Sequence, residues 1–166
     1  KGARVIGVDP NPRSLAYCRE RCPRDMEILE NAFWTTAGEV IVFHLPRAQD
    51  KLPKGADGVS GSLDPTHEYV DGGERIETRT VNLDMLLARA GRSECDVLKL
   101  DVEGAEYALL HALVASGRIR AARQLLVEFH HGVTRHLPED TQRIVALLAG
   151  AGYSLIHTEG RNYIFR

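Results

Sequence analysis

Charged residues follow directly on an apolar run near the middle of the chain, where residues 96–106 read DVLKLDVEGAE. This pattern predicts a buried strand that ends at Asp101, a turn through Gly104 and a helix that starts after it. In an open α/β sheet, ligands bind at the carboxyl ends of the strands. Carboxylates there can accept a proton or bind a polar group, so the segment predicts a functional site.

Three side chains in this region are predicted to be catalytic: Asp101, Glu103 and His130. His130 follows another apolar strand, residues 124–129. Histidine is the better base at neutral pH, and a carboxylate whose pKa is raised by burial can also serve. Glu103 could instead stabilise a helix N-terminus, and His130 could lie in solvent. The same residue types can bind a divalent ion, but they often occur without one, so no metal is predicted.

Lys99 is unusual in an otherwise apolar strand, because a buried ammonium group needs a partner. Glu128 lies near the corresponding end of the strand expected to be its neighbour. We therefore hypothesise a buried ion pair between Lys99 and Glu128 that ties the two strand ends together.

Asp9 ends the first apolar run of the chain, ahead of Pro10. In nucleoside-binding α/β folds, an acidic side chain at a strand end hydrogen-bonds the ribose hydroxyls, and Asp9 can take that role. An Asp-Pro turn, or a cap toward Ser14, explains the residue equally well.

Apolar runs alternate with helical stripes along the chain, which predicts an α/β fold with a mostly parallel sheet covered by helices. The segments 28–34 and 39–45 alternate in polarity across Gly38 and are predicted to form a small hairpin extension. Residues 46–74 are predicted to be an irregular surface loop, a kind of segment that is often functional. The remaining predicted helices lie at 12–21, 83–90, 105–115 and around 144–151, and the remaining strands at 5–8, 75–81, 97–100 and 124–129, with a terminal hairpin of 153–157 and 162–165.

The length and composition of the chain limit the number of domains and the kinds of partner that it is expected to have. The chain has 166 residues and a formal net charge of -2, which predicts a single domain over residues 1–166. No run of Lys and Arg is present, so nucleic acid is not expected as a partner. No apolar stretch is long enough for a membrane helix, so a membrane is not expected as a partner either. The three cysteines, an odd number, predict reduced thiols and a cytoplasmic location.

Several motifs together resemble the FkbM-type methyltransferases, over nearly the whole chain. They are DPNP (residues 9–12), NAFW (31–34) before GEV (38–40), GSL (61–63), VNLD (81–84), DVLKLDVEGAE (96–106) and LVEFH (126–130). The resemblance implies a Rossmann-like class I methyltransferase fold with an antiparallel last strand and S-adenosylmethionine as cofactor. It implies that Asp9, Asn31 and Asp101 bind this cofactor, although Asn31 could also be a plain turn residue. The family's first strand and glycine-containing loop have no counterpart, so the N-terminal strand is expected to be missing.

The favoured interpretation is therefore a methyltransferase that modifies a hydroxyl of a small molecule or glycan. The resemblance implies that the loop around Ser62 and Leu63 covers this acceptor. A dinucleotide-dependent oxidoreductase is one alternative, because Asp9 suits either cofactor. Against it, Tyr107 is followed four residues later by His111 rather than by lysine. A noncatalytic module with a degenerate methyltransferase fold is the other alternative. The oligomeric state does not follow from the sequence.

Overall fold

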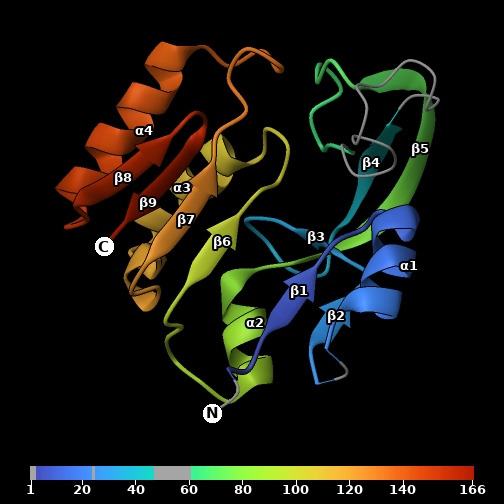
Figure 1. Cartoon of the computed structure of the whole chain (residues 1–166), viewed down its shortest axis with the longest axis horizontal. Coiled ribbons are helices and arrows are strands. Elements are labelled where there is room, and N and C mark those ends of the chain that lie inside the picture. The colour runs from blue at the N-terminus through green and yellow to red at the C-terminus, as the bar shows by residue number, and fades with distance from the viewer. Residues whose placement is uncertain (1–2, 24, 47–60) are drawn as a thin grey trace.

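The computed structural model describes residues 3–23, 25–46 and 61–166, and it folds into three small sheets with helices packed around them (Figure 1). The strands are β1 (Ile6–Val8), β2 (Glu27–Leu29), β3 (Ala32–Phe33), β4 (Val40–Pro46), β5 (Val70–Val81), β6 (Leu98–Leu100), β7 (Leu125–Glu128), β8 (Leu155–Glu159) and β9 (Asn162–Phe165). The helices are α1 (Pro12–Arg21), α2 (Leu83–Ala90), α3 (Glu106–Ala115) and α4 (Pro138–Gly150), with a 3-10 turn at Arg118–Ala121.

The sheets are mixed, so the expectation of a mostly parallel sheet is wrong for the described residues. The first sheet pairs β1 with β2 in parallel, and the second has the order β3-β5-β4. The third has the order β6-β7-β9-β8, with β6 and β7 parallel and the other two pairs antiparallel. The predicted antiparallel last strand and terminal hairpin are confirmed, and β8 forms the outer edge.

The predicted hairpin of residues 28–34 and 39–45 is also wrong. β3 and β4 do not pair with each other: both pair with β5, which lies between them. Val40 stands opposite Arg79 and His44 opposite Arg75 in an antiparallel ladder, so β5 takes the place that the nearby segment was expected to fill. Alternating polarity identifies a strand, but it does not identify the strand's partner.

The helices α1, α2 and α3 begin and end close to the predicted residues, whereas α4 begins at Pro138, six residues before its predicted range. Local capping groups explain the starts of α1 and α2. Asn11 accepts a hydrogen bond from Arg13 N at the start of α1, where Pro12 holds the first helical position. Asn82 caps α2 in the same way, and Gly91 ends that helix in the left-handed conformation. Within the described ranges, none of the helices has both the length and the apolar composition needed to cross a bilayer.

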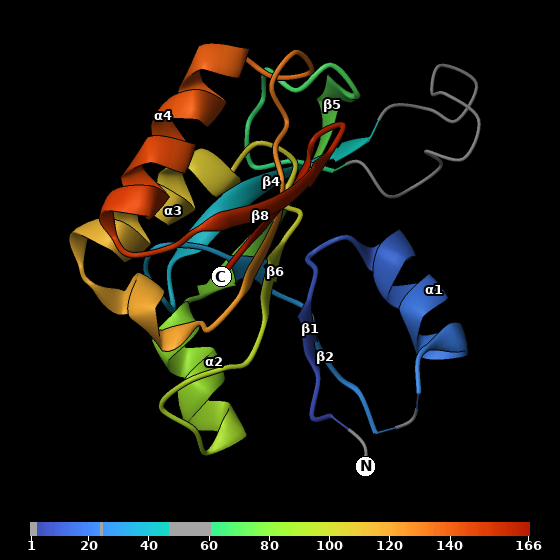
Figure 2. The ribbon, with the colours of Figure 1, turned by 60° about the vertical axis from the view of Figure 1, so that its left-hand side comes forward.

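The main core lies between the third sheet and the helices α3 and α4, which pack on the same side of it (Figure 2). Its most buried side chains, each at most 1% exposed, include Leu100, Leu109, Leu110, Leu125 and Phe129. The opposite face of this sheet carries exposed side chains along β8 and at Lys99. The parallel register of β6 and β7 places their carboxyl ends side by side at one edge of this core.

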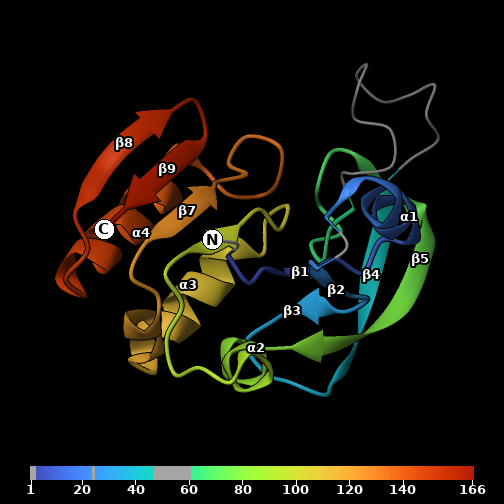
Figure 3. The ribbon, with the colours of Figure 1, turned by 60° about the horizontal axis from the view of Figure 1, so that its bottom comes forward.

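The sheet β1-β2 lies on the side of β6 that faces away from β7 (Figures 1 and 3). Arg4 donates to the carbonyl oxygens of Arg89 and Ala90 at the end of α2, at 2.9 and 3.0 Å. Glu27 on β2 forms an ion pair with the Arg89 side chain. These contacts hold β1 so that its carboxyl end points the same way as those of β6 and β7 (Figure 1).

Lys99 is exposed, so the hypothesis of a buried pair with Glu128 is wrong. Its ammonium group lies 2.7 Å from Asp101 Oδ2, and its side chain is 60% exposed. In the parallel register Lys99 stands opposite Leu126, whereas Asp101 follows on its own strand two residues later. Glu128 instead lies 3.4 Å from the guanidinium group of Arg161.

Candidate functional site

The three predicted catalytic residues lie together at the carboxyl ends of β6 and β7. His130 Nε2 is 3.1 Å from Glu103 Oε2 and 3.9 Å from Asp101 Oδ1. Glu128 Oε1 is also 3.9 Å from the same nitrogen. We call these four residues, with Glu106, the acidic cluster.

Glu106 is the first residue of α3, and its carboxylate fixes the imidazole of His130. The side chain is fully buried and accepts hydrogen bonds from Gly104 N at 2.9 Å and His130 N at 2.7 Å. His130 Nδ1 lies 3.3 Å from Glu106 Oε1, and a carboxylate can only accept, so the Nδ1 proton points to Glu106. His130 Nε2 therefore faces the carboxylates of Asp101, Glu103 and Glu128.

The pKa of His130 is raised above its ordinary value by these carboxylates. Burial alone would lower the pKa, because it disfavours the charged ring. The hydrogen bond and charge of Glu106 oppose this effect, and the charges of Glu103 and Asp101 add to the opposition. These carboxylates therefore favour the protonated, positively charged form of the His130 ring.

Glu103 connects the acidic cluster to a second histidine, His67. Its Oε2 atom is 2.9 Å from His67 Nε2, and the His67 side chain is fully buried. His67 Nδ1 accepts from Tyr69 N at 3.2 Å, so the proton of a neutral ring is on Nε2. The Glu103 side chain, 20% exposed, is held between His67 and His130.

The backbone at residues 103–104 turns in the left-handed region twice in succession. Glu103 has φ 52° and Gly104 has φ 106°, and Glu103 is the one non-glycine residue with positive φ among the described residues. A Cβ atom at position 104 would lie 2.8 Å from Thr134 Cγ2, so only glycine fits there. Ser62 Oγ donates to Glu103 O at 2.5 Å and holds the turn from the other side.

Asp9 lies at the carboxyl end of β1 and faces the same region. It accepts from Asn11 N at 2.7 Å, as expected of an Asp-Pro turn. Its pKa is raised, first by burial, and the charges of Asp101 and Glu103 raise it further, whereas hydrogen bonds from Asn11 and Ser14 lower it. The carboxylates that follow β6 are therefore close enough to Asp9, at the end of β1, to repel its charge.

Asn31 follows β2, and its side-chain amide donates to Arg79 O at 3.0 Å. The amide nitrogen thus holds the start of β3 against β5. Its predicted role in cofactor binding stays a prediction.

Two residues of the site were not singled out from the sequence, His67 and Glu106. Glu106 lies at a helix N-terminus, where an acidic residue is expected because its charge interacts favourably with the helix dipole. The sequence pattern does not show that its side chain is buried. His67 lies in the segment 46–74, which has no periodicity to indicate its orientation; residues 47–60 of that predicted loop lie outside the described residues. Residues 70–74 of it belong to β5.

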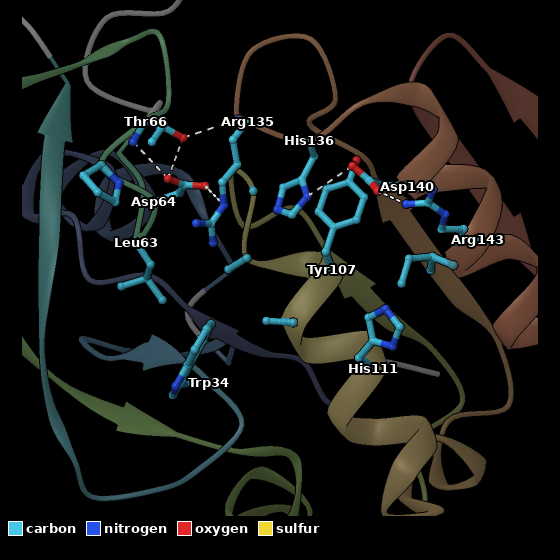
Figure 4. A pocket seen from close by; sticks show the side chains of 15 residues that line it. Trp34, Leu63, Asp64, Thr66, Tyr107, His111, Arg135, His136, Asp140 and Arg143 are labelled. Carbon is cyan, nitrogen blue, oxygen red and sulfur yellow. Dashed lines mark hydrogen bonds and ion pairs between the residues drawn. The ribbon is translucent and has the colours of Figure 1, made fainter.

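A cavity of about 440 Å³ adjoins the acidic cluster on the side of α3 and α4 (Figure 4). Gly104, which follows Glu103, lines it, whereas Asp101, Glu103 and His130 do not. Its walls combine aromatic and charged side chains: Trp34, Leu63, Asp64, Tyr107, His111, Arg135, His136, Asp140 and Arg143. Tyr107 was expected to be a packing residue, and it is 4% exposed with its ring stacked on that of His136.

The arrangement of strand-end carboxylates beside a parallel strand pair is typical of α/β enzymes that bind a small cofactor. The model of the methyltransferase FkbM domain matches residues 1–155. The chain therefore belongs to the FkbM methyltransferase family, and the resemblance in its motifs is confirmed. A search of curated proteins and a search of solved structures each found no match.

Proposed function

We propose that this protein transfers a methyl group from S-adenosylmethionine to a hydroxyl oxygen of a small molecule or glycan. The observation that carries the proposal is the convergence of Asp9, Asp101 and Glu103 at the ends of β1 and β6, beside the buried His130. Membership of the FkbM methyltransferase family supports the reaction class.

The acidic residues fit the cofactor chemically. S-adenosylmethionine carries a positively charged sulfonium, an ammonium group and two ribose hydroxyls, and when bound it supplies the methyl group. Asp9 is half-buried and accepts hydrogen bonds from Asn11 N and from Ser14, and the remaining lone pairs of its carboxylate can accept from ribose hydroxyls. Asp101, 35% exposed, would interact with the ammonium group.

Glu103 is the residue we assign as proton acceptor. Its side chain is 20% exposed, whereas that of His130 is 2% exposed, so an acceptor hydroxyl reaches Glu103 more easily. As the acceptor oxygen takes the methyl group, its proton moves to the Glu103 carboxylate. His130 Nε2 and His67 Nε2 lie 3.1 and 2.9 Å from this carboxylate. A positioned base contributes about 10²- to 10⁴-fold to a rate.

The cavity next to Gly104 would hold the part of the acceptor that does not react. Its volume of about 440 Å³ suits a small molecule or one or two sugar rings. Trp34 offers a flat apolar surface, and Asp64 and Arg135 offer hydrogen-bonding groups. Such a mixed lining is suited to a hydroxylated ligand.

Isothermal titration calorimetry with S-adenosylhomocysteine and with NAD tests the proposal. We expect micromolar binding of S-adenosylhomocysteine, no binding of NAD, and at least tenfold weaker binding in Asp9→Asn. Asp25→Asn is the matched control, because Asp25 is exposed on the connection between α1 and β2. Binding of NAD alone would favour the oxidoreductase, and binding of neither would favour the noncatalytic module.

A further inference from the structure

The acidic cluster carries more negative charge than its neighbours neutralise. Four carboxylates surround His130, those of Asp101, Glu103, Glu106 and Glu128. Within ion-pair distance of them the described residues offer two permanently cationic side chains, Lys99 beside Asp101 and Arg161 beside Glu128. Both of these are substantially exposed and therefore screened by water, whereas His130 and Glu106 are buried. A partly buried excess of negative charge favours the binding of a cation.

His130 is oriented as a ligand rather than as a packing residue. Glu106 accepts from Nδ1 and so directs Nε2 toward the other carboxylates, of which Glu103 is nearest at 3.1 Å. Metal-binding histidines have this geometry: one ring nitrogen donates to a carboxylate behind it and the other binds the ion. The side chain of His130 is 98% buried, since 2% of it is exposed.

A second observation, on His67, indicates that a polar atom beside the acidic cluster lacks a hydrogen-bond partner in the described part of the chain. Its Nε2 atom is fully buried and has no hydrogen-bond partner among the residues that the structure describes, although Glu103 Oε2 is 2.9 Å away. The imidazole and the carboxylate are thus close without being aligned. A shift of Glu103 toward His67 would align this pair and move the carboxylate away from His130 Nε2.

We propose that Asp101, Glu128 and His130 form a binding site for a divalent transition-metal ion. One ligand atom of each residue lies within 4.8 Å of the others, and the three come from the ends of two adjacent parallel strands, β6 and β7. Bonds of about 2.0–2.2 Å to a shared ion require only a small closing of these side chains. One imidazole with two carboxylates suits Mn²⁺, Fe²⁺ or Zn²⁺ better than Ca²⁺, which prefers oxygen ligands alone.

Three protein ligands leave coordination positions open for other groups. If the proposed methyl transfer is correct, on which this step rests, the acceptor hydroxyl occupies one of them. The ion would lower the pKa of that hydroxyl and orient its oxygen, while Glu103 beside it takes the proton. No metal is predicted from the sequence, because such residues often occur without one, and Glu128 is expected there to pair with Lys99, a pair that the structure does not form.

Titration of the protein with MnCl₂ alone, followed by calorimetry, tests the cation site. We expect one saturable site per chain, and at least tenfold weaker binding in Asp101→Asn and in Glu128→Gln. Asp96→Asn is the control, because Asp96 precedes the same strand, is 82% exposed and lies outside the cluster. Equal weakening in Asp96→Asn would indicate general attraction to acidic surface and overturn the proposal.

Electron paramagnetic resonance tests Mn²⁺ binding to the protein without any amino-acid substitution, because its signal measures the concentration of free Mn²⁺. A free-ion signal that is undiminished by millimolar protein would overturn the cation site. S-adenosylhomocysteine binding, measured separately in the presence of a chelator, keeps the two proposals apart. If S-adenosylhomocysteine binds and Mn²⁺ does not, the proposed cation site is refuted and the proposed function stands. If Mn²⁺ binds and S-adenosylhomocysteine does not, the proposed function is refuted and the cation site stands.

Discussion

Replacing Glu106 by glutamine should destabilise the protein although the two side chains have nearly the same size. The carboxylate accepts from three N–H groups, those of Gly104 N, His130 N and His130 Nδ1. Glutamine keeps one accepting oxygen, which can serve the two groups of His130, and turns its NH₂ group toward Gly104 N. One hydrogen bond to a charged group is lost and a buried N–H remains unpaired, so we expect a loss of about 3 kcal/mol.

Glu139→Gln provides the reference for this measurement. Both glutamates lie in the first turn of a helix, so each substitution removes a similar interaction with the helix dipole, about 0.3–1 kcal/mol. Glu139 is exposed, and the difference between the two variants isolates the buried hydrogen bonds. The free energy of unfolding from urea denaturation, followed by circular dichroism, is the assay. A Glu106→Gln variant within about 1 kcal/mol of Glu139→Gln would refute the argument.

Two further predictions concern the lining of the cavity. Burial raises the pKa of Tyr107 to about 12, although its hydrogen bond to Thr141 lowers it, so ultraviolet titration should show one late tyrosine that is missing in Tyr107→Phe. A titration curve that Tyr107→Phe leaves unchanged above pH 11 would contradict this. The pKa of Asp64 is lowered below 3.8: burial opposes the shift, but hydrogen bonds from Thr66 and the charge of Arg135 outweigh it. Its stabilising effect is therefore complete above the unfolded pKa and is lost as pH falls through the folded one, so Asp64→Asn should flatten the loss of stability below about pH 4. Parallel acid-unfolding curves for the two proteins would show that Asp64 has no such role.

The starts of α1 and α2 could be predicted from the sequence because local groups determine them. Asn11 with Pro12 begins α1, and Asn82 begins α2 three residues ahead of the amide that it caps. The pairing of β4 could not be predicted in this way. Its partner β5 follows a long intervening segment, and the polarity pattern of β4 suits any neighbouring strand.

The candidate site could be predicted in part, for a similar reason. Asp101 and His130 follow adjacent strands directly, so strand order alone brings them together. The partner of Lys99 depended on side-chain direction at an edge strand, which the sequence does not contain. The burial of Glu106 and the position of His67 beside Glu103 depend on how distant segments pack. No local sequence pattern predicts this packing.

If Glu103 is the proton acceptor that we propose, its left-handed backbone sets stability against activity at a single position. A residue with a Cβ atom loses about 1–2 kcal/mol in this conformation, a sizeable part of the 5–15 kcal/mol that a typical domain has in total. Glycine would be free of that strain, and yet it would remove the carboxylate held between His67 and His130. A laboratory selection for heat resistance alone would be expected to discard Glu103 early, and a selection that also demands turnover would be expected to retain it.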